Sequence, residues 1–340
     1  TDLRAITMDV LQHPSLPHGR VGRGSNGNAI MSGISAEIVS RTDPTQRRDL
    51  KLIWAWADHE QPNEDFRIVN ALTPDNGRMW ALNAHVLPDD RVAMFLADED
   101  FGYEGGSDLI ITLNFHSIYA GHSLGNVRFH VSSASKEALA TLPTAHTNWY
   151  IVGPFQPEGR DQNAYDVAFG PEEAPLDFAK TYEDQKWRYA PGVIEGQNVR
   201  LAETAGAEYV AREFFSPSKR SIDLSLGSDD GIQVYLNGAL VHENRVDRGV
   251  APDQDSLTIE LQPGRNTYVT KIVNTGGPGG IYYNEAIPED ELAPDMLAWV
   301  LPEPSVTDAF AELARVAWRT THSPRYLELS ESIATAQGDI

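Results

Sequence analysis

Apolar and polar positions alternate with a period of two along much of the chain. Residues 221–226, SIDLSL, give a clear case, because each apolar residue follows a polar one. Side chains of a β-strand point to opposite faces in turn, so this pattern indicates strands with one buried face. Similar short runs, separated by Gly, Pro, Asn and Asp, recur from LRAITMDVL to NTYVTKIVN. Many such strands predict an all-β protein of sandwich or jelly-roll architecture.

The strand pattern is interrupted at residues 136–148, KEALATLPTAHTN, which predict a linker or short helix. The chain has 340 residues, a length that suits two domains. We therefore expect β-sandwich domains over residues 1–143 and 144–290. Further on, Phe310, Leu313 and Trp318 share one helical face. Residues 291–340 are expected to form a short helical tail or a linker to a missing domain.

Composition excludes several classes of partner. The chain has 27 basic and 49 acidic residues and a formal net charge of −22, which repels phosphate backbones and anionic lipid. We expect no nucleic-acid partner. It has no cysteine, so disulfides and covalent haem attachment in this chain are excluded. No apolar run approaches the roughly 18 residues of a membrane span.

Two short motifs imitate catalytic sequences. Residues 121–125, GHSLG, match the G-x-S-x-G motif of hydrolases, which requires a helix after Ser123. The next residues, NVRFHVSS, predict a strand, so a hairpin turn is favoured and a Ser123-dependent hydrolase is a weak alternative. GRGSNG at residues 22–27 likewise precedes strand-like residues, whereas a dinucleotide site needs a helix there. We therefore expect no enzyme and no catalytic residues.

The acidic stretch GSDDG, residues 227–231, has two interpretations. Asp and Gly are strong turn formers, which predicts a hairpin turn at Asp230 and Gly231 and another at Asn237 and Gly238. Alternatively, Asp229 and Asp230 are calcium ligands, because carboxylate oxygens suit a hard cation, and the ion binds sugar hydroxyls. Nearby acids add potential further ligands at Asp247, Asp253 and Asp255. Both interpretations stay open from the sequence alone.

Aromatic and amide side chains extend this candidate site. An exposed ring offers an apolar face to the C–H surface of a sugar, and an amide oxygen can bind a cation or a hydroxyl. We predict ligand binding through Asp229, Asp230, Asn237, Trp187 and Tyr235, with calcium as a candidate cofactor on Asp229 and Asp230.

Longer segments carry a family resemblance. The segment from GSDDGIQVYLNG to NTGGPGG, with WYIVGPF at residues 149–155, resembles a jelly-roll module of large exported planctomycete proteins. Its SDDG core is similar to the protective-antigen-type lectin fold, in which paired aspartates hold calcium and sugar. LRAITMDVL, WAWADHEQ and GHSLGNVRFHVSS resemble the discoidin-like segment of planctomycete-type cytochrome c-associated multidomain proteins.

The resemblance implies two galactose-binding-like sandwiches with a non-catalytic, carbohydrate-binding or scaffolding role in a larger exported protein. It places such a protein in the periplasm, at the cell surface or outside the cell. The implied partners are a glycan or polysaccharide and neighbouring domains of the same parent protein. A purely structural spacer that positions a cytochrome or an enzyme domain is the main alternative.

Overall fold

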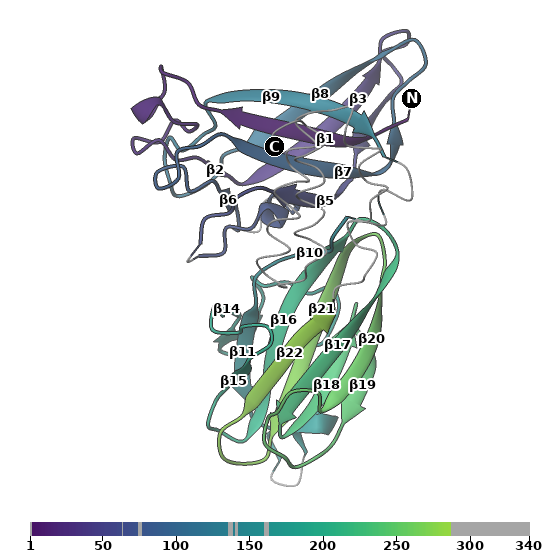
Figure 1. The fold of residues 1–340 in the computed structure, drawn as a ribbon. Coiled ribbons are helices and arrows are strands. Elements are labelled where there is room, and N and C mark those ends of the chain that lie inside the picture. The colour runs from purple at the N-terminus through teal and green to yellow at the C-terminus, as the bar shows by residue number, and fades with distance from the viewer. Residues whose placement is uncertain are drawn as a thin grey trace, which may run out of the picture. The chain divides into compact units, whose positions relative to one another are not determined.

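A computed structural model describes residues 2–62, 64–73, 77–134, 139, 142–159 and 163–286. Their strands form several antiparallel sheets, which confirms the all-β sandwich prediction. The chain divides into two compact units (Figure 1). Of the described residues, those up to Ala145 and Phe215–Ser218 belong to unit 1, and His146–Phe214 with residues 219–286 belong to unit 2. The helical tail predicted over residues 291–340 lies outside the described residues.

Unit 1 is a sandwich of two sheets with strand orders β5-β7-β1-β9 and β4-β3-β8, and a separate β2-β6 ribbon. Ile6 of one sheet and Ala36 and Ile38 of the other belong to the same buried cluster, so the two sheets pack face to face. The strands are β1 (Leu3–Leu11), β2 (Ile30–Met31), β3 (Gly33–Ser40), β4 (Arg47–Leu50), β5 (Leu52–Ala57), β6 (Trp80–Ala81), β7 (Arg91–Phe101), β8 (Ser107–Asn114) and β9 (Asn126–Ser133). Two 3-10 helices, η1 (Pro17–Gly19) and η2 (Ile68–Leu72), lie in its loops.

Unit 2 is a second sandwich. One sheet has the order β14-β11-β16-β21-β18-β19, with β10 added beside β16, and the other has the order β15-β22-β17-β20. Its elements are β10 (Ala145–His146), β11 (Tyr150–Phe155), η3 (Ala164–Asp166), β12 (Thr181–Tyr182), β13 (Gln185–Lys186), β14 (Arg188–Tyr189), β15 (Asn198–Arg200), β16 (Gly206–Ser216), β17 (Arg220–Asp229), β18 (Gly231–Leu236), β19 (Ala239–Asn244), β20 (Asp255–Leu261), β21 (Gly264–Asn274) and β22 (Gly280–Ala286).

Burial in β17 follows the sequence pattern. Ile222, Leu224 and Leu226 are buried, while Ser221 and Asp223 are exposed. The strand therefore has one face in the core and one in solvent, as its period of two predicts.

Strand β16 differs, because every one of its positions is buried. Val210 and Phe214 belong to the core between the two sheets, whereas Tyr209 and Ala211 belong to a second buried cluster. That cluster also contains Tyr165 and other residues of the segment that precedes β16. The sheet is thus packed on both faces.

The two turns expected around β18 have different outcomes. A hairpin at Asp230 and Gly231 is wrong, because β17 pairs with β20 and β22 while β18 pairs with β19 and β21 in the other sheet. The acidic stretch therefore crosses between sheets. The hairpin at Asn237 and Gly238 is confirmed: it joins paired Leu236 and Ala239, and its two residues have φ of 52° and 81°.

The glycine motifs of unit 1 lie next to strands. The segment containing Ser123 leads directly into β9, with no helix after the serine, and the segment after GRGSNG leads into β2 and β3. Gly22 forms a bridge with Leu124, and Ser123 accepts a backbone hydrogen bond from Arg23, so the two glycine-rich turns pack together. The strand–turn–helix geometry of a hydrolase elbow is absent at Ser123.

Candidate ligand site at the acidic rim

Three connections of unit 2 are joined by hydrogen bonds at one end of the sandwich. They are the β17–β18 crossing, the β19–β20 loop at residues 245–254 and the β21–β22 loop at residues 275–279. We call this site the acidic rim and define it by Asp229, Asp230, Asp247, Arg248 and Thr275. The peptide bond between Asp229 and Asp230 is cis.

Asp230 is the structural member of the aspartate pair. Its side chain is buried, and Oδ1 accepts a hydrogen bond from the Arg248 backbone N–H at 3.1 Å. Oδ2 accepts from the backbone N–H and the hydroxyl of Thr275, at 2.8 Å and 2.5 Å. Burial alone would raise the pKa of Asp230, but these donors outweigh it and lower the pKa. One carboxylate thus ties both loops to the crossing.

The pKa of Asp229 is shifted in the opposite direction. It is only half-buried, and its pKa is raised by partial desolvation, then by the charge of Asp230 and, to a smaller extent, that of Asp247. The Val250 backbone N–H, which donates to Asp229, only partly offsets these effects. Asp229 therefore presents a carboxylate that a hydrogen-bond donor or a cation would stabilise.

Arg248 fixes the β19–β20 loop against the sheet. Its Nη2 donates to Ser228 Oγ at 2.8 Å and pairs with the buried carboxylate of Asp255. Asp255 also accepts from Asn244 Nδ2 at 2.8 Å, and His242 Nε2 lies 3.1 Å from it. The loop is held in place by these contacts before any ligand binds.

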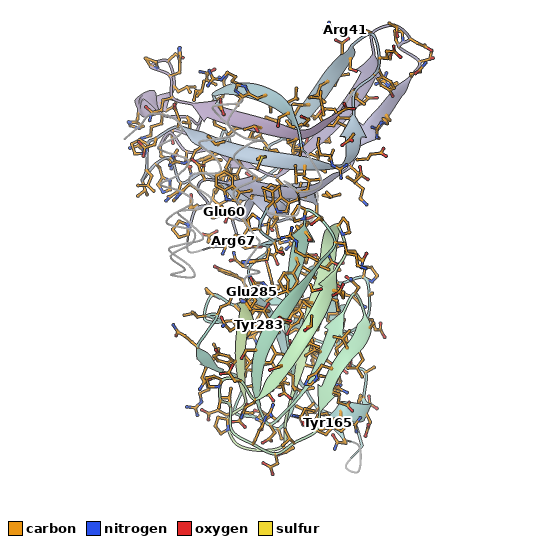
Figure 2. The ribbon with its side chains drawn as sticks, turned by 45° about the vertical axis from the view of Figure 1, so that its right-hand side comes forward. Arg41, Glu60, Arg67, Tyr165, Tyr283 and Glu285 are labelled. Carbon is orange, nitrogen blue, oxygen red and sulfur yellow. The ribbon has the colours of Figure 1, made fainter. Side chains whose placement is uncertain are left out.

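Glycines give the rim both its support and its open backbone. A Cβ on Gly231 would lie 1.6 Å from the Tyr165 hydroxyl, so only glycine lets Tyr165 pack there; Figure 2 labels Tyr165 at this end of unit 2. In contrast, a Cβ on Gly276 or Gly277 would meet nothing within 4 Å, and one on Gly249 would only approach Asp229 Oδ2 at 4.0 Å. The loop backbone at these three glycines is accessible to a ligand.

Asn237 does not join the rim. It lies at the other end of β18, roughly 20 Å along the strand from Asp230. Its amide Nδ2 donates to Asn266 Oδ1, and its Oδ1 accepts from the Thr267 backbone N–H at 2.8 Å. The amide therefore stabilises the hairpin that its left-handed φ helps to form. Tyr235, on the same strand, is half-buried, and its hydroxyl lies 3.3 Å from Gln233 Oε1.

Trp187 was predicted to be an exposed ring that stacks on a sugar, but the structure buries it. Only 7% of it is exposed, and it packs edge-on against Phe178 and Tyr182, with ring centroids 5.5 and 6.3 Å away. Its ring fills the cluster on the outer face of the β16 sheet, because large aromatic surface contributes most when buried. The predicted combination of the two aspartates with Asn237 and Trp187 is therefore not assembled.

The rim only partly fits a calcium ion. Asp229 and Asp247 offer the carboxylate oxygens that Ca²⁺ prefers, but both oxygens of Asp230 already accept protein hydrogen bonds. Among the described residues, the group of three histidine or acidic side chains that lie within 4.8 Å of one another contains none of these aspartates. Calcium binding here stays a prediction that depends on Asp229.

Thr275 and Arg248 are rim residues that the sequence interpretation missed. They follow Asp230 by 45 and 18 positions, and no spacing rule connects them. The glycine-rich stretch NTGGPGG, which contains Thr275, was the one local signal of a loop near the site.

Comparisons with known proteins give distant likenesses only. No protein-family model matches the chain, and no curated protein matches it either. Among solved structures, a β-glucosidase from Kluyveromyces marxianus is 16% identical over 55% of this chain, at a TM-score of 0.25, and the match spans 23% of the β-glucosidase chain. An anti-sigma factor domain-containing protein from Clostridium clariflavum is 12% identical over 85% of this chain and 95% of its own, at 0.25.

A lectin from Pleurotus ostreatus, solved with GalNAc, is 12% identical over 85% of this chain and 77% of its own, at a TM-score of 0.19. Likenesses at these scores carry no argument about function, and none supports the planctomycete or cytochrome c association. The sandwich assignment therefore depends on the strand pairing itself. No helix among the described residues is long and apolar enough to cross a membrane.

Proposed function

We propose that unit 2 is a non-catalytic carbohydrate-binding module whose ligand binds at the acidic rim. The observation that carries this proposal is the contrast within the aspartate pair. The carboxylate of Asp230 accepts hydrogen bonds that stabilise the fold, and its pKa is lowered. Asp229 is half-exposed, its pKa is raised, and it lies beside loops whose glycine backbone is accessible. Sugar hydroxyls are donors that a carboxylate accepts in charge-assisted hydrogen bonds, each contributing about 1.5–3 kcal/mol.

The rest of the proposal follows from the family resemblance of the sequence. It places the module in a larger exported protein, with neighbouring domains as its partners in the same chain. Calcium, bound through Asp229, is an optional part of the same site. A structural spacer without a ligand is the competing function, and it predicts no glycan binding in any condition.

A glycan array with and without calcium tests the proposal. The wild-type protein should bind a subset of glycans, and Asp229→Asn should weaken that binding at least about tenfold, the loss of one charge-assisted hydrogen bond. Asp223→Asn is the matched control, because Asp223 is an exposed aspartate of the same strand β17. Wild-type protein that binds no glycan, or an Asp229→Asn variant that binds like wild type, contradicts the proposal. A chelator effect on the wild type alone would assign calcium to Asp229.

A further inference from the structure

A second group of ionisable side chains lies in unit 2 on elements that the rim does not use. His146 of β10, Glu195 of the β14–β15 loop and Glu285 of β22 each offer one ligand atom, and these atoms lie within 4.8 Å of one another. We call these three residues the His–Glu cluster. Figure 2 labels Glu285 beside Tyr283, two positions earlier on β22.

Backbone pairing brings the three residues together. Strand β10 lies beside β16, and the Thr147 N–H donates to the Glu213 carbonyl at 3.0 Å, which places His146 beside β16. The Gly196 N–H donates to the Tyr283 carbonyl at 2.8 Å, which holds the neighbouring Glu195 near β22. The convergence is therefore a product of the fold.

A second observation is that neighbouring groups hold all three side chains by hydrogen bonds or close polar contacts. Tyr283 Oη, on a buried ring, donates to Glu285 Oε2 at 2.9 Å, and Arg212 Nη1 donates to Glu195 Oε1 at 2.5 Å. His146 Nδ1 lies 3.2 Å from the Thr147 carbonyl oxygen. In metal sites a neighbouring group commonly holds a binding carboxylate or imidazole in place in this way.

The charge of the group favours a cation. Two carboxylates face one guanidinium, that of Arg212, which is 1% exposed and whose Cζ lies 4.3 Å from the Trp149 ring centroid. With both carboxylates ionised, the sum is one negative charge in a partly desolvated place. Two close carboxylates repel each other, and a bound cation relieves that repulsion.

The contact with Arg212 and metal binding through Nε2 require different tautomers of His146. Nδ1 of His146 contacts Arg212 Nη2 and the Thr147 carbonyl, and it cannot accept from the first and donate to the second at once. When Nδ1 accepts from Arg212, a neutral imidazole carries its proton on Nε2, which then cannot bind a metal. When Nδ1 donates to the Thr147 carbonyl, Nε2 has the lone pair that a metal-binding histidine requires.

We propose that His146, Glu195 and Glu285 form a binding site for a divalent first-row transition metal ion, in unit 2 and separate from the acidic rim. One imidazole with two carboxylates suits zinc-type ions better than calcium, which takes oxygen ligands. Ligand atoms around tetrahedral zinc lie about 3.4 Å apart, so small side-chain rotations from the observed spacing suffice.

Calorimetric titration of the full chain with ZnCl₂, together with metal analysis after dialysis, tests the proposal. The wild type should bind one equivalent of Zn²⁺, and excess Ca²⁺ should not displace it. His146→Ala and Glu285→Gln should each weaken binding by at least about tenfold, since even groups outside the ligand set change metal affinity by 10–100-fold. Glu285→Gln keeps the size of the side chain, so it decides the question alone if His146→Ala fails to fold.

His242→Ala is the matched control, because His242 also lies beside a carboxylate in unit 2, at 3.1 Å from Asp255 Oδ1, but outside the cluster. It should retain wild-type zinc affinity. The proposal is overturned if the wild type shows no one-to-one binding, if a folded cluster variant keeps wild-type affinity, or if His242→Ala loses it equally.

Discussion

The acidic rim and the His–Glu cluster both gather carboxylates in unit 2, yet they neutralise them differently. At the rim, backbone N–H groups and a threonine hydroxyl stabilise Asp230, and its pKa falls. In the cluster, burial and the neighbouring Glu195 raise the pKa of Glu285 to about 7, although Arg212 and the Tyr283 hydroxyl oppose this. Several short hydrogen bonds therefore outweigh desolvation at the rim, while a single guanidinium shared by two acids does not do so in the cluster.

Of the three substitutions predicted here, replacing Arg212 should lower the free energy of unfolding most. Arg212→Met leaves Glu195 and Glu285 without a counter-charge, and breaking a buried ion pair from one side costs about 3 kcal/mol or more of unfolding free energy. Urea unfolding followed by circular dichroism measures it. Arg200→Met is the control, because the Arg200–Glu203 pair is exposed, with 66% and 69% of the side chains accessible, and should change stability by under about 1 kcal/mol. Equal losses in the two variants would show that Arg212 does not act as a buried counter-ion.

Local features of the fold could be predicted from the sequence, whereas features that depend on distant segments could not. The strand β17 and the hairpin at Asn237 and Gly238 were predictable, because period-two alternation and an Asn-Gly turn are local signals. The burial of β16 on both faces was not, since it depends on a preceding segment that folds over the sheet. For that reason Trp187, which belongs to this covering segment, was assigned to a ligand although it packs in a cluster.

The acidic rim and the His–Glu cluster also differ in how much of each could be predicted from the sequence. The rim was found because Asp229 and Asp230 are adjacent in sequence, but their separate roles depend on distant partners in two loops. The His–Glu cluster joins residues 146, 195 and 285 from three elements, so no spacing in the sequence indicates it. A carboxylate becomes structural or available according to the donors that the fold brings to it, and these come from the tertiary structure.

Asp230→Asn should give the second largest effect. An amide in place of the carboxylate cannot accept at both positions, so the N–H of Thr275 or Arg248 loses its acceptor, at a cost of about 2 kcal/mol. The folded-state pKa of Asp230 lies below the ordinary aspartate value of 3.8, so its stabilisation is full above that value and is lost as the pH falls through the folded pKa. The difference between wild type and Asp230→Asn in urea unfolding should therefore be constant near neutrality and shrink below about pH 4. A difference that persists unchanged in strong acid would contradict the role of the ionised carboxylate.

Asp229→Asn should give the smallest effect, and one of opposite sign. Because the folded-state pKa of Asp229 lies above 3.8, the folded protein binds this proton more tightly than the unfolded chain does. Ionised Asp229 therefore destabilises the fold, an effect that appears as the pH rises through these two pKa values and is complete above the folded pKa. Removing the charge should stabilise the protein at pH 7 by less than about 1 kcal/mol, as expected for a half-exposed group.

This gain should disappear in acid, where Asp229 is protonated and matches asparagine in charge. Melting temperatures of wild type and Asp229→Asn at pH 7 and near pH 3 measure both parts, and Asp223→Asn, on the exposed face of the same strand, reports the general effect of removing one acid from a chain of net charge −22. A variant less stable than wild type at pH 7 would mean that Asp229, like Asp230, serves the fold. A carboxylate that serves a ligand is not needed for stability, whereas a structural carboxylate is. That result would therefore also remove Asp229 from the proposed ligand site.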